Sequence, residues 1–406
     1  MLNVKSVQET LDIIHSAFTL IQRSEIVALE DAFGRILAED IVSDQNIPAF
    51  NRSSMDGYAL RARDTFGASD TMPVPLTLSE EVKMGISPTF QLSINQAAYI
   101  PTGAELPQGA DGVVMIEYTE DYHDGSVYIQ KAIAPGNNVI FKGDDIKEGQ
   151  LVLSTGTSLR GQDIGILAAL GIASLKVRVP LTMAVVSTGD EIIEITQQPQ
   201  GSQVRDVNAY VIVAEAKRMG VNAYRVGIVV DDEELLYRKL DALLNEVDLL
   251  VLSGGSSVGM KDNSVAVLNR LGKPGVLVHG IAVKPGKPTL IAKARGKAIL
   301  GLPGHPASAF TIFRIFGKEL IETLSGSKIS DTIVKAKLSI NVPSNHGREE
   351  YVPVTLEWMD DILYAHPLFG KSGMISLLSL ADGYIRILRE SEGFDHASWV
   401  DVTLFH

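Results

Sequence analysis

The feature that most constrains the fold is a change of hydrophobic period between residues 178 and 327. Apolar runs of strand length, LTMAVVS, YRVGIVV and DLLVLS, alternate there with the amphipathic stretches AYVIVAEAKRMG and EELLYRKLDALLNEV. A third helical stretch covers residues 304–324, with Pro306 in its first turn. Strands that alternate with helices are typical of a parallel sheet with helices on both faces. The sequence therefore predicts a doubly wound α/β domain over residues 178–327.

Patterns of period two flank this domain on both sides. Between residues 46 and 147, short apolar segments alternate with prolines and glycines, which predicts a compact β-rich module. Five strand-like segments without an obvious helix follow residue 328 and predict a small β-barrel over 328–406. An amphipathic helix is predicted within residues 1–24 from the spacing of Val7, Leu11, Ile14, Phe18 and Ile21.

Composition and charge narrow the classes of function. With 406 residues, of which 45% are hydrophobic, the chain is long enough for several domains. A formal net charge of −13 disfavours nucleic acid and anionic membranes as main partners, because the field of the whole protein repels both. A small anionic ligand is compatible with this charge if a few lysines and backbone amides gather in one cleft.

Cysteine usage and the N-terminal residues bear on location. The chain has no cysteine, which excludes disulfides and thiolate metal sites and fits a reducing compartment. The start MLNVKSVQETLDIIHSAF mixes acidic and polar residues with apolar ones, unlike a signal or transit peptide. No uninterrupted apolar run reaches the roughly 18 to 20 residues of a membrane span. We therefore expect a cytoplasmic location.

Polar or glycine-rich residues follow every predicted strand of the doubly wound domain. Residues 188–191 follow the first strand, Asp231 and Asp232 the second, and a run of glycines and serines the third. The KPGKP turn at 284–288 and the LPGHP turn at 302–306 follow the last two. Ligands of open α/β sheets bind outside the carboxyl ends of the strands, so we expect these five exits to surround one crevice. The residues predicted to bind a ligand there are Gly189, Asp190, Asp231, Ser253, Gly254, Gly255, Ser256, Pro285, Gly286, Lys287, Pro303, Gly304 and His305.

The glycine run and the lysine turn favour an anionic ligand. Successive backbone N–H groups before a helix form a concave anion site, and the missing Cβ atoms allow close approach. Lys284 and Lys287 flank a rigid Pro-Gly turn and suit a phosphate or an oxyanion as point charges, unless the turn is a solvated loop. His305 adds a hydrogen-bond donor or a base.

Carboxylates beside an anion site indicate a cation. Glu191, Asp231 and Asp262 are candidate ligands of Mg²⁺, which takes one or two carboxylates and completes its shell with water and substrate phosphates. The alternative for Asp231 and Asp232 is that they begin the next helix, where acidic residues are favoured. For Glu191 the alternative is an ordinary surface position.

The β-rich module has an unusual stretch of its own. NRSSMDGYAL at 51–60 gathers an arginine, two serines and Asp56 on one turn. Asp56-Gly57 alone predicts only a turn, but the full set is richer than a turn requires.

Seven motifs occur in the order that is typical of one family: NRSSMDGYAL, IPTGAELPQGADGVVMIE, PGNNVIFKGDDIKEGQLVLSTGT, VSTGDE, LSGGSSVGMKD, KPGKPTL and GLPGHPAS. On these motifs the chain resembles the molybdopterin molybdenumtransferases, the MoeA group, which is also similar to the E domain of gephyrin. The resemblance covers nearly the whole chain and is densest between residues 46 and 310.

The resemblance implies an elongated homodimer whose subunits combine α/β and β domains. The cleft would lie between the doubly wound domain of one chain and the β module of the other. The N-terminal helix would pack near the doubly wound domain. The implied domains are the helix at 1–24, a linker domain at 25–45 and 148–177, the inserted module at 46–147, a MogA-like doubly wound domain at 178–327 and the barrel at 328–406.

The resemblance also implies a reaction. A metal derived from molybdate enters adenylylated molybdopterin and AMP leaves, with Mg²⁺ as the cofactor. Carried over by motif, Thr102, Asp231 and Ser372 bind the substrate. The implied catalytic residues are Asp56, Glu191, Asp262 and Lys284, of which Asp56, Glu191 and Asp262 also arrange the metal ion. Transient contact with other enzymes of molybdenum cofactor synthesis is implied as well.

The chain departs from the family pattern at two basic positions. Many members carry a basic residue four positions before the first lysine of KPGKP, where this chain has Gly280, and an arginine near Pro353, where Arg348 is the nearest counterpart. A preference for tungstate over molybdate therefore stays open. Adenylyl transfer to molybdopterin and a dimeric scaffold without catalysis stay open as well.

Overall fold

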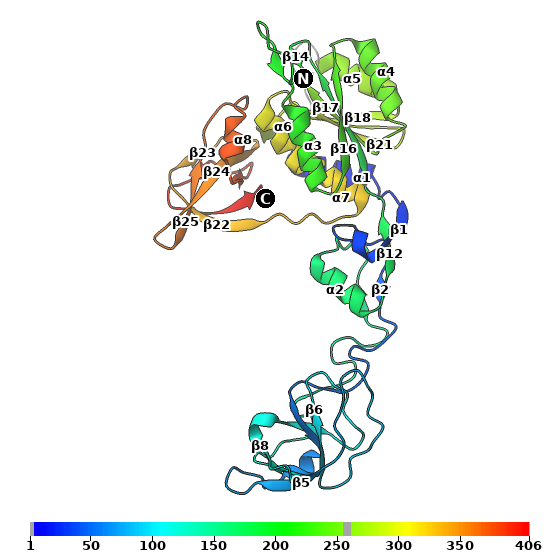
Figure 1. Ribbon diagram of the computed structural model, residues 1–406. Coiled ribbons are helices and arrows are strands. Elements are labelled where there is room, and N and C mark those ends of the chain that lie inside the picture. Colours follow the sequence, from blue (N-terminus) through cyan, green and yellow to red (C-terminus); the bar gives the residue numbers. More distant parts are fainter. Residues whose placement is uncertain (1–3, 255–260, 406) are drawn as a thin grey trace.

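The molecule is elongated, with two folded bodies at one end, a β-rich module at the other and a narrow connection between them (Figure 1). The computed structural model describes residues 4–254 and 261–405, without the side chains of residues 261–263. Gly255, Ser256 and the Asp262 side chain, which the sequence assigns to the site, lie outside the described residues. Within the described part of the chain, no helix is long and apolar enough to cross a membrane.

A six-stranded sheet forms the centre of the doubly wound domain, in the order β16-β13-β17-β21-β20-β18. Four of its strands, β16, β13, β17 and β21, run parallel. β13 and β17 are buried along almost their whole length, as expected of parallel strands that helices cover on both faces. The strands are β13 (Thr182–Thr188), β16 (Asn222–Val229), β17 (Leu249–Gly254), β18 (Pro274–His279), β20 (Leu290–Ala294) and β21 (Lys297–Leu302).

Two helical layers cover the sheet. On one face, Met183 and Val185 pack in the same core as Ile212 and Phe313. On the other face, the intervening residues of the same strand pack against a second layer of helices. The first layer consists of α1 (Val7–Ala17), α3 (Asn208–Arg218), α6 (Pro306–Ile312) and α7 (Lys318–Ser325), with a π-helical turn, η4 (Phe313–Gly317), between the last two; the second consists of α4 (Glu233–Leu243) and α5 (Lys261–Leu271).

The sheet departs from a purely parallel one at β20, a strand that the sequence did not predict. This strand runs antiparallel to both of its neighbours, β18 and β21. The cause is a two-residue hairpin: Arg295 and Gly296 have φ angles of +50° and +79°, and two successive left-handed residues form the turn that suits the twist of paired strands. Since β18 consequently runs in the same direction as β21, its carboxyl end still reaches the same edge of the sheet.

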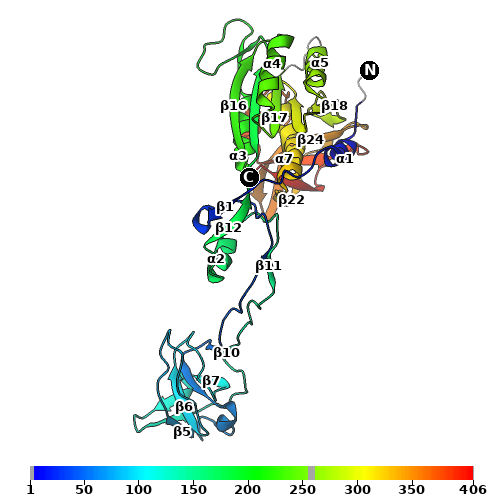
Figure 2. The same ribbon diagram turned by 90° about the vertical axis from the view of Figure 1, so that its right-hand side faces the viewer.

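The narrow connection is built from two separate passes of the chain. β1 (Ser24–Ala28) pairs antiparallel with β12 (Ser174–Arg178), and β2 (Ile41–Val42) pairs antiparallel with β11 (Leu151–Leu153). Leu37, Leu159 and Leu167 form part of its small core, together with residues from the flanking helices. Figure 2 shows these segments running between the two ends of the molecule. The helices are η1 (Leu29–Asp31) and α2 (Gly161–Ala169).

The module that these passes carry is a six-stranded sheet in the order β7-β4-β6-β5-β9-β8. Both of its faces are covered: Tyr58 and Leu60 belong to one core and Ala59 to another. Its elements are β3 (Arg52–Ser53), β4 (Gly57–Leu60), η2 (Ala62–Thr65), β5 (Val74–Leu78), β6 (Gln96–Ile100), β7 (Gly112–Met115), η3 (Ile116–Tyr118), β8 (Thr119–Asp121), β9 (Ser126–Ile129) and β10 (Val139–Ile140).

The C-terminal domain is a closed five-stranded barrel, as predicted. Its ring runs β24-β25-β22-β28-β26 and closes because β26 also pairs with β24. One short helix, α8, was not expected and interrupts the loop before β26. The elements are β22 (Ile333–Leu338), β23 (Val342–Pro343), β24 (Glu349–Met359), β25 (Ile362–Pro367), α8 (Ser376–Leu380), β26 (Gly383–Ile387), β27 (Gly393–Phe394) and β28 (Trp399–Leu404).

Candidate active site

A large pocket opens at the carboxyl edge of the doubly wound sheet, with a volume of about 1440 Å³. Four of the five predicted strand exits line it, and the exit of β16 with Asp231 does not. The predicted residues that it brings together are Glu191, Ser253, Gly254, Lys284, Pro285, Gly286, Lys287, Pro303, Gly304, His305 and Ser372.

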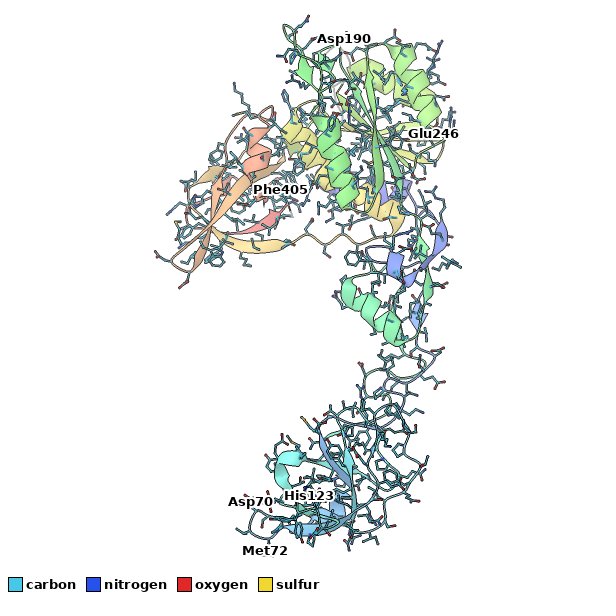
Figure 3. The ribbon with its side chains drawn as sticks, in the orientation of Figure 1. Asp70, Met72, His123, Asp190, Glu246 and Phe405 are labelled. Carbon is cyan, nitrogen blue, oxygen red and sulfur yellow. The ribbon has the colours of Figure 1, made fainter. Side chains whose placement is uncertain are left out.

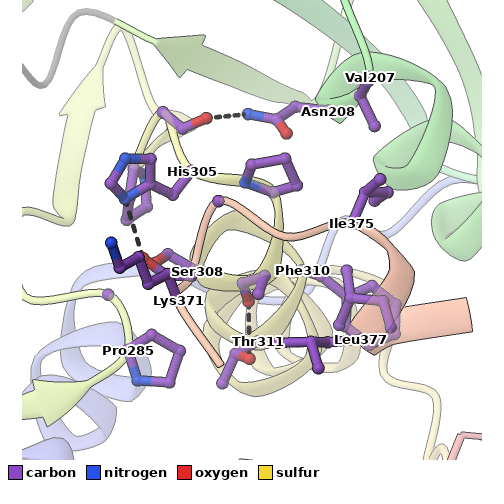
Figure 4. A pocket seen from close by; sticks show the side chains of 18 of the residues that line it. Val207, Asn208, Pro285, His305, Ser308, Phe310, Thr311, Lys371, Ile375 and Leu377 are labelled. Atoms are coloured by element: carbon purple, nitrogen blue, oxygen red, sulfur yellow. Dashed lines mark hydrogen bonds between the residues drawn. The ribbon is translucent and has the colours of Figure 1, made fainter. Parts of the chain in front are cut away.

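The C-terminal barrel supplies the wall opposite the sheet. β24 and the loop around α8 contribute lining residues, among them Lys371, Ile375 and Leu377. In Figure 4, His305 lies on one side of the pocket, while Ile375 and Leu377 lie on the other. The sheet side of the pocket therefore carries the lysine turn and the glycines, while the barrel side adds apolar side chains such as Ile375 and Leu377.

A buried arginine of the η4 turn holds the barrel against this edge. Arg314 donates hydrogen bonds to the backbone oxygens of Leu404 (2.9 Å) and Phe405 (3.2 Å) near the chain end. The same guanidinium contacts the carboxylates of Glu215 at 3.2 Å and Asp331 at 3.6 Å. The opposite wall is thus fixed to the doubly wound domain by ionic and backbone contacts rather than by chain connectivity alone.

The lysine turn is anchored by the barrel. Lys284 lies in β19 (Val283–Lys284), a short strand that pairs in parallel with the start of β24. Its ammonium group forms an ion pair with Glu350, whose side chain is 9% exposed. Glu350 in turn accepts a hydrogen bond of 2.9 Å from the Ser344 hydroxyl. Lys284 is therefore held by a buried carboxylate and is not part of a freely solvated loop.

Gly286 allows this turn to pack closely. Its φ angle is +117°, and a Cβ atom there would lie 2.4 Å from Cγ1 of Ile312 on α6. The Gly286 carbonyl accepts a 2.7 Å hydrogen bond from the Thr289 hydroxyl. Lys287, at the other end of the turn, is exposed and lines the pocket. The turn therefore directs two ammonium groups to the same pocket edge.

His305 and Ser372 join the two walls. Nδ1 of His305 and the Ser372 hydroxyl lie 2.9 Å apart, and the Ala307 amide donates to the Ser372 carbonyl at 3.1 Å. Figure 4 shows His305 on the pocket side of the start of α6. A loop of the barrel is thereby tied to the LPGHP turn of the sheet.

Asp231, which was predicted to bind the substrate or a metal ion, does not line this pocket. Its Oδ1 accepts a 2.9 Å hydrogen bond from the Thr188 hydroxyl, and its Oδ2 accepts one of 3.3 Å from the Asp190 amide. The two residues are bonded reciprocally, because Oδ1 of Asp190 accepts a hydrogen bond of 3.1 Å from the Asp231 amide. These bonds align the exits of β13 and β16, and neither Asp190 nor Asp231 lines the pocket. Asp232 begins α4 as its N-cap, since its carboxylate accepts from the Leu235 amide.

Glu191 is the carboxylate that reaches the pocket from this loop. It is exposed and precedes β14 (Ile192–Ile193), which pairs in parallel with β15 (Val204–Arg205). Gly189 has a φ angle of +146°, and a Cβ atom there would lie 2.8 Å from Oε2 of Glu191. The glycine therefore leaves room for the glutamate side chain. Among the described residues, no group of three histidines or carboxylates is placed to hold a metal ion.

Asp56 and Thr102 meet each other but not the pocket of their own chain. The Thr102 amide donates to Oδ1 of Asp56 at 2.7 Å, and both residues are exposed on the module. Asp190 lies at the end of the molecule opposite the module tip that carries Asp70 (Figure 3). The predicted metal ligands Asp56 and Glu191 are thus on different ends of one chain.

Comparison with known proteins finds matches to one family over nearly the whole chain. Models of the MoeA N-terminal region (domain I and II), a molybdopterin binding domain and the MoeA C-terminal region (domain IV) match residues 5–171, 184–323 and 335–405. The molybdopterin molybdenumtransferase of Bacillus subtilis is 31% identical over 386 residues, which are 94% of this chain and 90% of that protein. The chain belongs to the MoeA family.

Further relatives agree in sequence and in structure. The molybdopterin molybdenumtransferase of a Nostoc species is 33% identical over 93% of this chain and 88% of its own length. A crystal structure of a molybdopterin biosynthesis MoeA protein from Pyrococcus horikoshii is 30% identical, covers 99% of this chain and all of that chain, and superposes with a TM-score of 0.87.

The structure shows the surroundings of Gly280 and Arg348, the two positions at which the chain departs from the family's basic pattern. Gly280 has a φ angle of +93°, and its carbonyl accepts from the Lys5 amide at 3.0 Å. The position thus anchors the N-terminal segment in a backbone conformation that favours glycine. Arg348 lines the pocket from the start of β24, and its buried Nε has no hydrogen-bond partner among the described residues.

The sequence missed Ser187, Asp206 and Asn208 as pocket residues, and it raised Arg348 only as the nearest counterpart of the arginine near Pro353. A signal for Ser187 exists, because LTMAVVS and DLLVLS end with a serine at matching positions. The place of Arg348 in the pocket depends on how the barrel packs, which no local pattern in the sequence shows.

Proposed function

We propose that this protein inserts a molybdate-derived metal into adenylylated molybdopterin and releases AMP, in a Mg²⁺-dependent reaction of the cytoplasm. The observation that carries the proposal is the pocket in which Glu191, the KPGKP lysines and the His305–Ser372 pair converge in a MoeA-family chain. An anionic substrate fits this cationic side, although the protein as a whole is acidic.

Lys284 and Lys287 are the residues for the oxyanion and the phosphates. Ammonium groups bind these anions as point charges, and a fixed ammonium stabilises the charge that develops when the pyrophosphate link is cleaved. Lys284 starts from a defined position because it is paired with Glu350, which in turn accepts a hydrogen bond from Ser344. Arg348 adds a further cation at the same pocket and is the counterpart, from a different position of the chain, of the arginine that many members carry near residue 353.

Mg²⁺ fits this pocket, because among the described residues the Glu191 carboxylate is not engaged in the kind of ion pair that Asp206 and Glu350 make. This ion usually takes one or two protein carboxylates and completes its shell with water and substrate phosphates. Glu191 lines the pocket and makes no side-chain hydrogen bond with the described residues, so its oxygens are available. When bound, Mg²⁺ neutralises the charge of the pyrophosphate group.

A homodimer completes the site in this proposal. Asp56 and Thr102 form an exposed pair on a module that cannot reach the pocket of its own chain. A second copy in the opposite orientation brings its module to that pocket, in the symmetric arrangement that is commonest among homodimers. Asp56 of the second copy then stands beside Glu191 as the second carboxylate.

The test is AMP release and metal incorporation by the purified dimer with adenylylated molybdopterin and Mg²⁺, with molybdate and tungstate in parallel. We expect AMP release that depends on an oxyanion and is lost in Glu191→Ala. The comparison of AMP release with molybdate and with tungstate shows which metal is preferred, a question that the surroundings of Gly280 and Arg348 leave open. Tight binding of the substrate without AMP release for either oxyanion contradicts the proposal.

A further inference from the structure

Two serine hydroxyls lie next to each other where the sheet meets the pocket. Ser187 on β13 and Ser253 on β17 are register partners on neighbouring parallel strands, and both line the pocket. On the same face of the sheet each is preceded by a buried valine, Val185 or Val251. The two apolar columns of the core thus end in hydroxyl groups at the pocket, and both serines are at most 3% exposed.

The Ser187 hydroxyl is fixed as an acceptor for any ligand. Its Oγ lies 2.8 Å from Oδ2 of Asp206, a buried residue whose carboxylate also accepts from Arg225 at 3.2 Å. A carboxylate paired with a guanidinium only accepts hydrogen bonds, so the Ser187 proton points to Asp206. What remains on Ser187 for a ligand is the lone pairs of its oxygen.

The Ser253 hydroxyl, in contrast, is oriented as a donor for a ligand. Nδ2 of Asn208 lies 2.9 Å from Oγ of Ser253 and 2.8 Å from the Gly304 carbonyl oxygen. Because a carbonyl oxygen only accepts, the amide group of Asn208 must face it with its nitrogen, and Ser253 receives the second N–H. Figure 4 shows the Asn208 amide donating across this end of the pocket. Ser253 donates no hydrogen bond within the described residues, so its own proton is available to a ligand.

A phosphate or an oxyanion is a poor match for this pair. Anion oxygens only accept, yet Ser187 has no proton left to give and stands in front of the Asp206 carboxylate. A neutral group that carries a donor and an acceptor side by side matches both hydroxyls. Neighbouring strands lie about 4.8 Å apart, so one edge of a planar ring can contact both at once.

We propose that Ser187 and Ser253 recognise the hydrogen-bonding edge of a planar nitrogen heterocycle, with Ser187 accepting from a ring N–H or amino group and Ser253 donating to a ring nitrogen or carbonyl. The inference rests on the proposed function, because the proposed substrate contains two such rings, a pterin and an adenine. It assigns the heterocycle to the sheet side of the pocket, beside the loops that hold the anions. Asp206 and Asn208 are positioning residues that set the direction of each hydroxyl.

Binding of two separate probes, AMP and 6-carboxypterin, to the full-length chain without molybdate tests this assignment. The variants are Ser187→Ala and Ser253→Ala, and Ser325→Ala is the control because it removes a buried serine of α7 outside the pocket. Thermal unfolding of each variant checks the fold. We expect both pocket variants to bind one probe about tenfold more weakly, the loss of one hydrogen bond that leaves its partner unpaired, while the control binds as the wild type.

The outcomes separate this inference from the proposed function. Weaker binding of 6-carboxypterin alone assigns the pair to the pterin, and weaker binding of AMP alone assigns it to the adenine. Unchanged binding of both probes by both variants, or no binding of either probe to the wild type at millimolar concentration, overturns the inference. Neither binding result depends on AMP release. The role of the two serines can therefore be refuted even if the dimer releases AMP normally.

Discussion

At the scale of a single residue, the geometry of Lys284 makes it the ammonium group with the most defined position in the pocket. Lys284→Met removes a fixed positive charge, so we expect kcat for AMP release to fall about a hundredfold, as for the loss of one preorganised stabilising group. Steady-state kinetics of the purified dimer measure this. Lys335→Met is the control, since Lys335 is an exposed lysine of the outer barrel surface. Equal losses in both variants count against a specific role of Lys284.

Gly254 is the residue whose substitution tests the local backbone at the end of β17. Its φ angle is +107°, and a Cβ atom there would lie 2.0 Å from the backbone oxygen of Thr188. Gly254→Ala therefore combines an unfavourable backbone conformation with a backbone overlap, and we expect a loss of at least about 3 kcal/mol in the free energy of unfolding.

The matched control for this substitution is Gly67→Ala. Gly67 has a similar φ angle of +93°, but no atom lies within 4 Å of its hypothetical Cβ. For Gly67→Ala we expect a loss of about 1 kcal/mol in the free energy of unfolding, from the backbone conformation alone. Urea unfolding of both variants measures the difference, and equal losses show that the overlap at Thr188 is relieved by a small shift.

Residues near a strand end could be predicted from the sequence, but their partners could not. The exits of β13 and β17 and the lysine turn are local patterns, and the rule that ligands bind at carboxyl ends places them together. The contact between Asn208 and Ser253 joins residues 45 positions apart, and the ion pair between Lys284 and Glu350 joins two domains. Such pairs follow from packing, so the sequence indicated the site but not what holds each side chain. For the same reason the sequence did not show that the Asp231 carboxylate accepts hydrogen bonds from Thr188 and Asp190.

At the scale of an element, helix α2 of the connection depends on one ion pair at its first turn. The Arg160 guanidinium donates to both oxygens of Asp163, at 2.9 and 3.1 Å, and these hydrogen bonds hold the pKa of the Asp163 carboxyl below its usual value. A carboxyl group whose pKa is lower in the folded state stabilises the fold above its unfolded pKa, about 3.9. That contribution is lost as the pH falls through the lower, folded pKa.

We therefore expect Asp163→Asn to lower the free energy of unfolding by about 2 kcal/mol at pH 7, the range for hydrogen bonds to a charged group. The difference from the wild type should narrow below about pH 4 and vanish at lower pH, because the wild-type carboxyl is then protonated. Urea unfolding at several pH values measures this. Asp70→Asn, at an exposed position of the module, is the control. A difference that stays constant with pH shows that the ion pair is not its cause.

Two elements show why element prediction failed where it did. β20 follows the lysine turn and was not predicted as a strand, and the two-residue Arg295-Gly296 hairpin makes it antiparallel to β21. α8 has only five residues, too few for a helical period to appear in the sequence. The long strands and helices of the doubly wound domain, in contrast, were predicted because their periods extend over many residues.

At the scale of the whole molecule, the shape separates two halves of a site. The connection keeps the module with Asp56 and Thr102 at one end, while the pocket with Glu191 and Lys284 lies at the other (Figure 1). A folded monomer of this shape therefore carries an incomplete set of the proposed residues. The proposal requires a second copy whose module completes the pocket.

The most direct measurement of this central claim is AMP release by mixed dimers. Asp56→Ala and Lys284→Met homodimers are each expected to be nearly inactive, because every cleft lacks one group. A dimer of one chain of each kind contains one cleft with both defects and one intact cleft. Random mixing of the two variants should therefore restore about a quarter of the wild-type activity, since half of the dimers are mixed and each has one intact site. Mixed dimers without AMP release, formed from chains that exchange and fold normally, contradict a cleft shared between two chains.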